Sequence, residues 1–282
     1  MIKKHKKNFR KHTFFQEFFS LFMLFYMSII IFLIVNTILN SLKSKSELAL
    51  NIIGFPKNPT LDNYRVVLIE DRFLFYILNS LFLTITAVCA VLVVSSMVAY
   101  GLSRYKFKGK NLLQIFFLLG LMFPIQLGIL PNFILLRSMH LINNFLGMIL
   151  LFAANISFPF FIFFKHFQAL PYSLQDAARI DGAGEFTIFF KIMLPICRPV
   201  FITVGLITAI NLWNDFYLSL VFLTEEQVRT MPLGIYKYLS LFLQSWDKVF
   251  PAVTISLLPI IILFFFSAEK IVSGLASGAT KE

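Results

Sequence analysis

The polar side chains that could contact a solute lie inside two long apolar stretches of this sequence. Asn155 lies in one stretch, and Asn211, Trp213, Asn214 and Asp215 cluster in another. Aromatic rings stack on the apolar faces of a sugar while amides and carboxylates bond its hydroxyls, so these five residues are candidates for a solute path. Plainer roles compete, because tryptophan often anchors a helix at a membrane interface and asparagine often links helices. We interpret Asp215 as structural, at the mouth of such a path.

The groups that catalysis or metal binding needs are scattered along the chain. The four histidines, none with an acid or a second histidine at ligand spacing, are His5, His12, His140 and His166. Two cysteines, Cys89 and Cys197, are too few for a disulfide framework or a thiolate metal site. The sequence contains no GxxxxGKS or GxxxxGKT phosphate loop. We therefore expect no catalytic residue, no metal site and no cofactor on this chain.

The elements that must position the polar residues are membrane helices. Hydrophobic residues make up 58% of the 282 residues and charged residues only 14%, whereas about 25% of a typical soluble protein is charged. The chain also holds 36 phenylalanines, more than a soluble core of this size can bury. Six stretches are long enough to cross a bilayer: Phe18–Asn40, Phe73–Tyr100, Leu112–Leu136, Leu141–Phe164, Pro199–Leu223 and Val249–Ala268. We predict an all-α polytopic membrane protein with six transmembrane helices, the first of them retained rather than cleaved as a signal peptide.

The distribution of charge predicts the orientation of these helices. With a cytoplasmic N-terminus, the inner segments hold 16 basic and 6 acidic residues, and the outer segments hold 9 and 7. Because lysine and arginine accumulate on the cytoplasmic side, both termini are expected in the cytoplasm of a bacterial inner membrane. The net charge of +11 is therefore attributed to topology and to anionic membrane lipid, and no nucleic-acid partner is expected.

One inner stretch, residues 166–198, is too polar to span the membrane and too long for a simple turn. Ser173 and Asp176 fit a capping box that starts a short helix ending near Ile180. Asp181-Gly182 is a turn dipeptide in which Gly182 can adopt positive φ. A second helix, with an apolar face, is expected to stop before Pro195. The result is a helical hairpin, and its three acids against only four bases, counting Lys165 just before it, favour a protein partner over anionic lipid.

The residues of this hairpin resemble a known motif. Leu174–Ala183, followed by Leu194-Pro195, is similar to the EAA motif of permease subunits of binding-protein-dependent ABC importers. Asp176 replaces the usual glutamate, which keeps the charge on a shorter side chain. Weaker matches to the carbohydrate branch, whose reference member is the smaller permease subunit of the maltose transporter, are Asn63-Tyr64, Ala99–Arg104, Phe107–Gly109, Trp213–Phe216 and Ser273–Ala279.

The resemblance implies a type I ABC importer permease fold in which the hairpin is a coupling helix. In that family the coupling helix seats in a cleft of a separate ATPase subunit, which binds ATP and Mg. It further implies as partners two ATPase subunits, a second homologous permease and an extracytoplasmic sugar-binding protein. The coupling residues implied by the resemblance are Asp176, Ala177, Ala178, Asp181, Gly182, Ala183, Leu194 and Pro195.

The expected organisation follows from the spans and the resemblance together. It comprises a basic cytoplasmic tail 1–17, a first transmembrane helix 18–40, an outer loop 41–72, a five-helix permease core 73–272 containing the hairpin 166–198, and a cytoplasmic tail 273–282. The main hypothesis is a non-enzymatic sugar importer subunit. Alternatives are an importer permease for a non-sugar solute and a self-contained secondary transporter. The latter would need ionisable groups deep in several spans, and Asp215 is the only one found.

Overall fold

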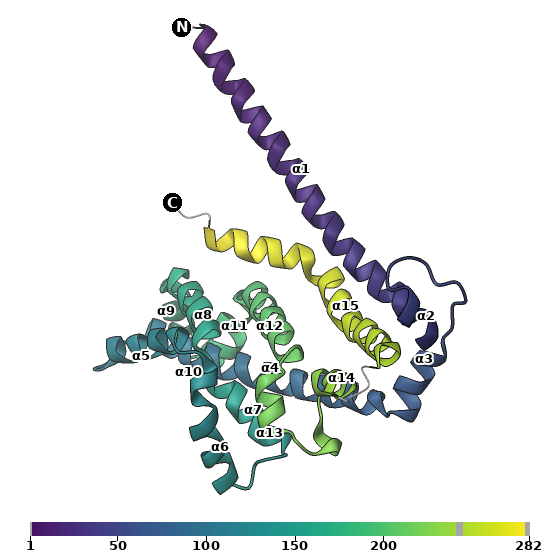
Figure 1. The fold of residues 1–282 in the computed structure, drawn as a ribbon. Coiled ribbons are helices and arrows are strands. Elements are labelled where there is room, and N and C mark those ends of the chain that lie inside the picture. The colour runs from purple at the N-terminus through teal and green to yellow at the C-terminus, as the bar shows by residue number, and fades with distance from the viewer. Residues whose placement is uncertain (1, 241–244, 280–282) are drawn as a thin grey trace. The chain divides into compact units, whose positions relative to one another are not determined.

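The structure is a computed structural model that describes residues 2–240 and 245–279, with side chains for residues 16–239 and 245–265. Every regular element in those ranges is helical (Figure 1). The longer helices are α1 (Ile2–Ser41), α4 (Phe73–Arg104), α5 (Lys110–Met122), α6 (Ile129–Ser138), α7 (Phe145–Ala154), α8 (Ser157–Ala169), α12 (Arg198–Trp213), α14 (Met231–Ser240) and α15 (Trp246–Ala279). The shorter helices and turns are α2 (Lys45–Leu50), α3 (Asp62–Arg65), η1 (Val66–Glu70), η2 (Ile125–Gly128), α9 (Ser173–Ile180), α10 (Glu185–Ile188), η3 (Phe189–Met193), α11 (Leu194–Ile196), α13 (Tyr217–Phe222) and η4 (Glu226–Val228).

The chain divides into two compact units. The first comprises residues 1–71 and 238–255, and the second comprises residues 72–237 and 256–282. In the first unit residues 41–71 of the predicted outer loop are folded on themselves. The Asn63 amide donates to the carbonyls of Ser41 and Lys43 at 3.1 and 2.8 Å. Lys248 pairs with Asp71 at 2.8 Å, which ties the start of α15 to the end of this loop.

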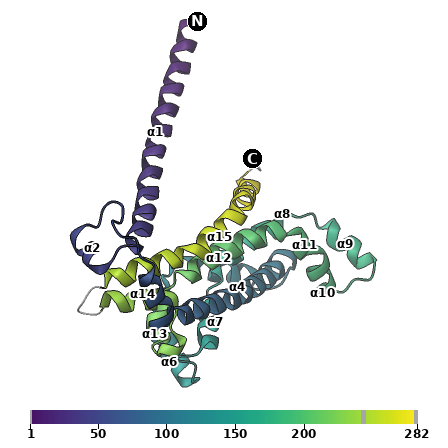
Figure 2. The same ribbon diagram turned by 90° about the vertical axis from the view of Figure 1, so that its right-hand side faces the viewer.

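The second unit is built around α4. This helix packs against α8, α7 and α12, and Figure 2 shows α9 and α10 beyond one end of the three neighbouring helices. Residues of α4 contribute to two clusters of buried apolar side chains. One cluster joins Tyr100 to the phenylalanines of α8 and to the hairpin, and the other joins Leu83 and Val91 to α7 and α13. Thus α4 contributes to both apolar clusters of this unit.

Three helical segments in the described ranges are long and apolar enough to cross a membrane without a break: Gln16–Ser41, Phe73–Arg104 and Trp246–Phe265. Three bent pairs also pass the same test, which gives up to six spans if each pair counts as one. These helices fit the polytopic membrane protein expected from the sequence.

The third and fourth predicted spans are not single helices. Leu112–Leu136 bends by 100° between Met122 and Ile125, because Pro124 has no N–H to donate and holds Phe123 in an extended conformation. Residues 141–164 bend by 48° between Ala154 and Ser157. Pro159 lies in the first turn of α8, just after the bend near Asn155. The bend of the third span was not expected from the sequence.

The fifth predicted span also ends earlier than expected. Within Pro199–Leu223, α12 stops at Trp213 and α13 is a separate helix of six residues. At its other end, α12 forms a bent pair with Glu185–Ile196, at an angle of 77°. The first and last helices extend beyond the predicted spans, because α1 begins at Ile2 and α15 continues to Ala279. The last residues of the predicted tail, 280–282, lie outside the described residues.

Candidate functional site

The hairpin consists of α9, a tight turn and a second arm formed by α10, η3 and α11. At the turn the N–H of Ala183 bonds to the carbonyl of Ala178 at 2.9 Å, and the N–H of Gly182 bonds to that of Arg179 at 3.0 Å. This pair of bonds is a Schellman motif, which needs a left-handed residue just beyond the helix. Gly182 occupies that position with φ +79°, as the sequence predicted. The glycine therefore sets the direction in which the second arm leaves α9.

Two predicted details of the hairpin are wrong. The capping box is absent, because Tyr172 already has helical angles and its carbonyl accepts from the N–H groups of Gln175 and Asp176. The side chain of Asp176 instead lies 3.5 Å from Arg179. The second arm also does not stop before Pro195. A π-helical turn at 189–193 shifts the hydrogen-bond register there, so the chain stays helical to Ile196 although Pro195 cannot donate.

The two alanines of the motif face different surroundings. Ala178 is only 6% exposed and belongs to the cluster around Tyr100. Ala177, Asp176, Asp181 and Gly182 are exposed, Ala183 and Leu194 are half-buried, and Pro195 is exposed. Ile180, beside the turn, is 86% exposed. Ala177, rather than Ala178, is therefore available to a partner, and Ala178 gives α9 a small residue where it packs on the rest of the chain.

A polar network joins the two arms of the hairpin to the end of α4. Glu185, the first residue of α10, accepts a hydrogen bond from the hydroxyl of Tyr105 and pairs with Arg179 at 2.9 Å. These two partners stabilise the charged form and lower the pKa of the Glu185 carboxyl. The Gln175 amide of α9, which is 2% exposed, donates to the Tyr100 hydroxyl at 2.6 Å. Sequence reasoning did not identify Tyr100, Tyr105 or Glu185 as functional residues.

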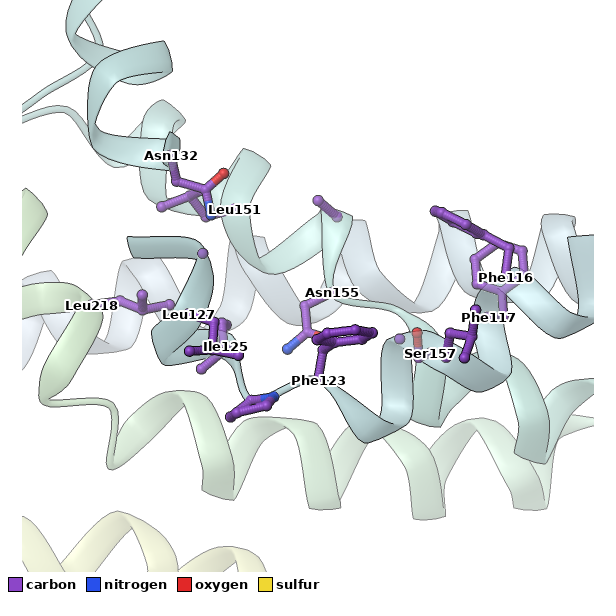
Figure 3. A pocket seen from close by; sticks show the side chains of 15 residues that line it. Phe116, Phe117, Phe123, Ile125, Leu127, Asn132, Leu151, Asn155, Ser157 and Leu218 are labelled. Carbon is purple, nitrogen blue, oxygen red and sulfur yellow. The ribbon is translucent and has the colours of Figure 1, made fainter. Parts of the chain in front are cut away.

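A groove of about 580 Å³ lies where the third and fourth predicted spans are broken. Figure 3 shows Asn155 beside the ring of Phe123, with Asn132 toward one end and Ser157 toward the other. Gly120 permits this arrangement, since a Cβ there would lie 2.3 Å from the Ser157 hydroxyl. The lining is apolar and aromatic with a few polar groups, which is the usual character of a small-molecule site.

Of the five candidates for a solute path, only Asn155 lines this groove. Trp213 is buried, and its indole N–H donates to the carbonyl of Ser256 at 3.2 Å. The Asn214 amide donates to the carbonyl of Ile210 at 2.8 Å, and Asn211 is exposed. The Asp215 carboxylate accepts from the N–H and the hydroxyl of Ser219, both at 2.9 Å, and so stabilises the start of α13. This position fits the structural role expected for Asp215.

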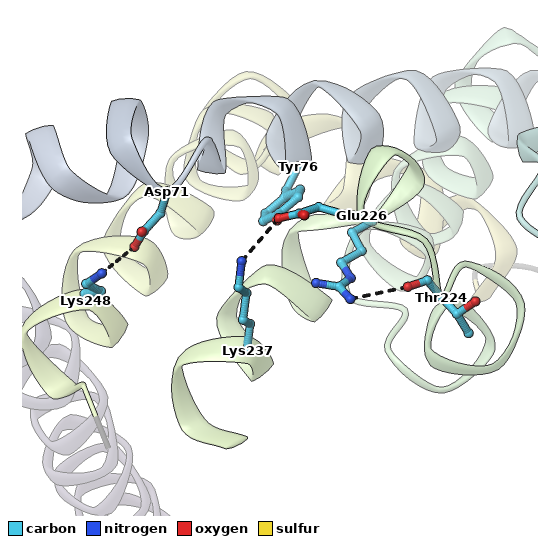
Figure 4. A network of polar contacts seen from close by, with 7 residues as sticks. Asp71, Tyr76, Thr224, Glu226, Lys237 and Lys248 are labelled. Atoms are coloured by element: carbon cyan, nitrogen blue, oxygen red, sulfur yellow. Dashed lines mark hydrogen bonds and ion pairs between the residues drawn. The ribbon is translucent and has the colours of Figure 1, made fainter. Parts of the chain in front are cut away.

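The other end of α4 holds the segment 224–237. The Asn79 amide donates to the carbonyls of Gln227 and Arg229, both at 2.9 Å, and the N–H of Met231 donates to the Ser80 hydroxyl at 2.7 Å. The Tyr76 hydroxyl donates to Glu226 at 3.1 Å, as Figure 4 shows.

Glu226 also pairs with Lys237 at 3.3 Å, and this ion pair and the tyrosine lower the pKa of its carboxyl. The sequence analysis missed this network. Its signal is three polar residues, at 76, 79 and 80, on one face of a mostly apolar helix.

Comparison with known proteins places this architecture in context. Residues 91–276 match a family model described as binding-protein-dependent transport system inner membrane component. The chain is 36% identical over 245 residues to the arabinooligosaccharides transport system permease protein AraQ of Bacillus subtilis, covering 86% of this chain and 87% of that protein. It is 29% identical to the probable starch degradation products transport system permease protein AmyC of Thermoanaerobacterium thermosulfurigenes, covering 86% of this chain and 89% of that protein.

The same architecture occurs in a solved structure. The crystal structure of a bacterial ABC transporter involved in the import of the acidic polysaccharide alginate has a TM-score of 0.83 with this chain, at 22% identity. The match covers 92% of this chain and 97% of that one. At this identity the likeness shows the fold, and it confirms the all-α polytopic class predicted from the sequence.

Proposed function

Because the chain belongs to the family of inner-membrane components of binding-protein-dependent transport systems, we propose that it forms half of the translocation path of an ABC importer for a mono- or oligosaccharide. The family match confirms the resemblance drawn from Leu174–Ala183. The choice of a sugar is supported by the relatives, whose names refer to arabinooligosaccharides and to starch degradation products. The family transports solutes rather than transforming them, so we assign no catalytic residue.

In this proposal the hairpin couples the chain to a separate ATPase. Asp176, Ala177, Asp181 and Gly182 are exposed at the tip, where another surface can approach closely. The Schellman turn at Gly182 and the packing of Ala178 and Ala183 at its base make the tip a fixed shape rather than a loose loop. ATP and Mg would be bound by the partner, since the sequence has no phosphate loop.

The hairpin also needs a firm attachment to the membrane part. Leu194 and Pro195, in the last turn of the second arm, lie a few residues before α12 and so belong to the covalent link between the hairpin and the membrane helices.

The proposed topology has six spans and cytoplasmic termini. The segments 1–17, 166–198 and 273–282 would be cytoplasmic, span 18–40 would be the first helix, and 41–72 would be an outer loop preceding the core 73–272. The charge distribution supports this orientation. A second homologous permease, two ATPase subunits and an extracytoplasmic sugar-binding protein would complete a transporter in the bacterial cytoplasmic membrane.

The groove at Asn155 is the part of this chain that we propose for sugar contact. Asn155 and Ser157 lie at one helix break and Phe123 lies at the other. Main-chain groups are released from helical bonds at such breaks, a feature of transporter binding sites. The rings of Phe116, Phe117 and Phe123 supply apolar faces. Asn211, Trp213 and Asn214 are weaker candidates, because they do not line this groove and because Trp213 already uses its single donor within the chain.

Gentle detergent purification of the tagged chain from its native membrane tests the proposal, with the co-purifying proteins identified by mass. We expect one kind of ATPase subunit and a second permease. A chain that purifies alone, and that moves solute after reconstitution without ATP, would contradict the proposal and favour a self-contained carrier.

A further inference from the structure

Helix α4 is one unbroken helix of 32 residues. At 1.5 Å per residue it is about 48 Å long, more than the roughly 30 Å of a bilayer's hydrocarbon core. Its two ends therefore reach opposite faces of the membrane. We propose that α4 is a rod that carries movement of the hairpin at residues 173–196 to the segment 224–237 on the opposite face. This inference rests on the proposed function, because the hairpin must be moved by the ATPase.

The hairpin is fastened to the rod through both of its arms. Glu185 in the second arm accepts from Tyr105, the residue that caps α4, and Gln175 in the first arm donates to Tyr100. The ring of Tyr100 also lies 5.0 Å from that of Phe189, centroid to centroid. Arg179 closes the network by pairing with Glu185 across the turn. A displacement of the hairpin would therefore displace the end of α4.

The opposite end of the rod is fastened to main-chain groups. Asn79 bonds two carbonyls of the segment 224–237, and Ser80 accepts the first N–H of α14. The Ser80 bond is buried, and a buried hydrogen bond is costly to leave unmade. A displacement of α4 would therefore displace this segment as well.

The covalent connections of the hairpin are softer than this rod. The hairpin joins the membrane helices through α8 and α12, and these helices belong to the pairs bent by 48° and 77°. A break in the helical hydrogen-bond ladder allows the two halves to move separately, so part of a push is absorbed there. Because α4 has no break, it is the stiffer route to the opposite face.

The test records a spin label in the segment 224–237, on the face opposite to the hairpin, before and after the ATPase is activated. A variant with Cys89→Ser and Cys197→Ala receives Gln227→Cys, whose exposed side chain is spin-labelled in the complex with its co-purified partners in nanodiscs. The spectrum is recorded before and after MgATP with vanadate. Glu185→Gln and Tyr105→Phe weaken the contact between the hairpin and α4. Asn79→Ala removes the bonds from the Asn79 amide to the segment 224–237. Tyr236→Phe, which removes an exposed tyrosine hydroxyl from α14, is the matched control.

MgATP should change the label's spectrum in the parent and in Tyr236→Phe. The spectral change should be smaller by about five-fold or more in each of Glu185→Gln, Tyr105→Phe and Asn79→Ala. A factor of about five is the lower end of typical coupling between sites. Tyr105→Phe combined with Asn79→Ala should be no worse than either alone, although distant substitutions usually add.

An unchanged spectral response in Glu185→Gln and Tyr105→Phe, with ATP hydrolysis retained, would contradict the proposal that α4 transmits the movement. A parent that hydrolyses ATP without a label response would overturn it too. If the ATPase no longer co-purifies with Tyr105→Phe, the network around Glu185 serves to dock the ATPase. That result would also contradict transmission through α4. If no ATPase co-purifies with the parent, the proposed function itself fails.

Discussion

The two ends of α4 are held by different kinds of contact. At the hairpin end, side chains meet side chains, as Tyr105 with Glu185 and Gln175 with Tyr100. Such contacts depend on the residue type at both positions, so both partners are constrained. Rings around Tyr100 surround them with an apolar cluster, which leaves the hairpin few alternative positions.

At the other end the contacts are directed mainly at the main chain. Asn79 and Ser80 bond carbonyl and N–H groups that any sequence would offer. The side chains of Glu225 and Gln227 remain exposed, so they can vary to suit a partner without loosening the end of α4. The comparison suggests one end built to transmit force through fixed residues and another built to hold a variable surface.

The largest effect is expected from Gly182→Pro at the hairpin turn. Proline fixes φ near −65°, whereas this position needs +79°, so the Schellman turn cannot form. We expect uptake by the reconstituted complex to fall about 100-fold, near the top of typical coupling between sites, with membrane insertion intact. Asp181→Lys, which places the wrong charge at the tip, should also uncouple transport.

Gly184→Ala is the matched control for this turn. Gly184 has an ordinary extended conformation, with φ −72°, and a Cβ there meets nothing within 4 Å. Its uptake should be that of the parent. Normal uptake in both Gly182→Pro and Asp181→Lys would remove the coupling role from the hairpin.

The opposite end of α4 should be sensitive to Gly234→Ala. A Cβ at Gly234 would lie 2.4 Å from the ring of Tyr76 and 3.0 Å from that of Phe73, and both rings are buried. Overpacking of this kind costs about 1–3 kcal/mol. Thermal unfolding in detergent should show a lower midpoint, whereas Gly101→Ala, with open space at its Cβ, should not lower it. Equal midpoints would mean that α14 does not pack on α4 as the structure shows.

A smaller contrast separates Trp213 from Asn155. Trp213→Phe loses the buried bond to Ser256 and should reduce stability by about 1 kcal/mol without changing the preference among sugars. Asn155→Ala, at an exposed position in the groove, should keep the stability and change the apparent affinity for the transported sugar. Competition between labelled and unlabelled oligosaccharides measures the second effect. A change of sugar preference in Trp213→Phe, together with a loss of stability in Asn155→Ala, would contradict both assignments.

The smallest effect concerns pH. The pKa of Glu185 lies below its ordinary value of 4.5, because Tyr105 and Arg179 bond the charged form. The stabilisation by this carboxylate is therefore present above pH 4.5 and is lost as the pH falls through the lowered pKa. Because Glu185 is largely exposed, the loss should be slight. Hydrogen exchange of the hairpin should be insensitive to pH between 7 and 5 after correction for the intrinsic rate. A change in protection within that range, absent in Glu185→Gln, would contradict this assignment.

The sequence predicted the parts of this molecule that rest on local rules. The hairpin with its turn at Gly182 follows from a dipeptide and a motif, and the polytopic class follows from long uncharged stretches. The same rules missed the 100° bend at Pro124, since the apolar stretch reads as continuous across that proline.

Contacts between distant residues could not be predicted in this way. The partner of Glu185 is Tyr105, 80 positions away, and that of Asn79 lies almost 150 positions away. A single sequence carries no record of such pairs. For the same reason Ala177 and Ala178 looked equivalent, although only the packing of α9 decides which one is buried.

The central claim is that the hairpin tip meets an ATPase in the cytoplasm, whereas the proposed topology assigns the segment 41–72 to the outside. Site-specific photo-crosslinking in native membranes tests it directly, with a photoreactive residue at exposed Ala177 and, as the control, at Leu61, which is 69% exposed. The account predicts an adduct with an ATPase subunit from position 177 and none from position 61. An ATPase adduct from position 61, or its absence from position 177 in an actively transporting complex, would contradict the account.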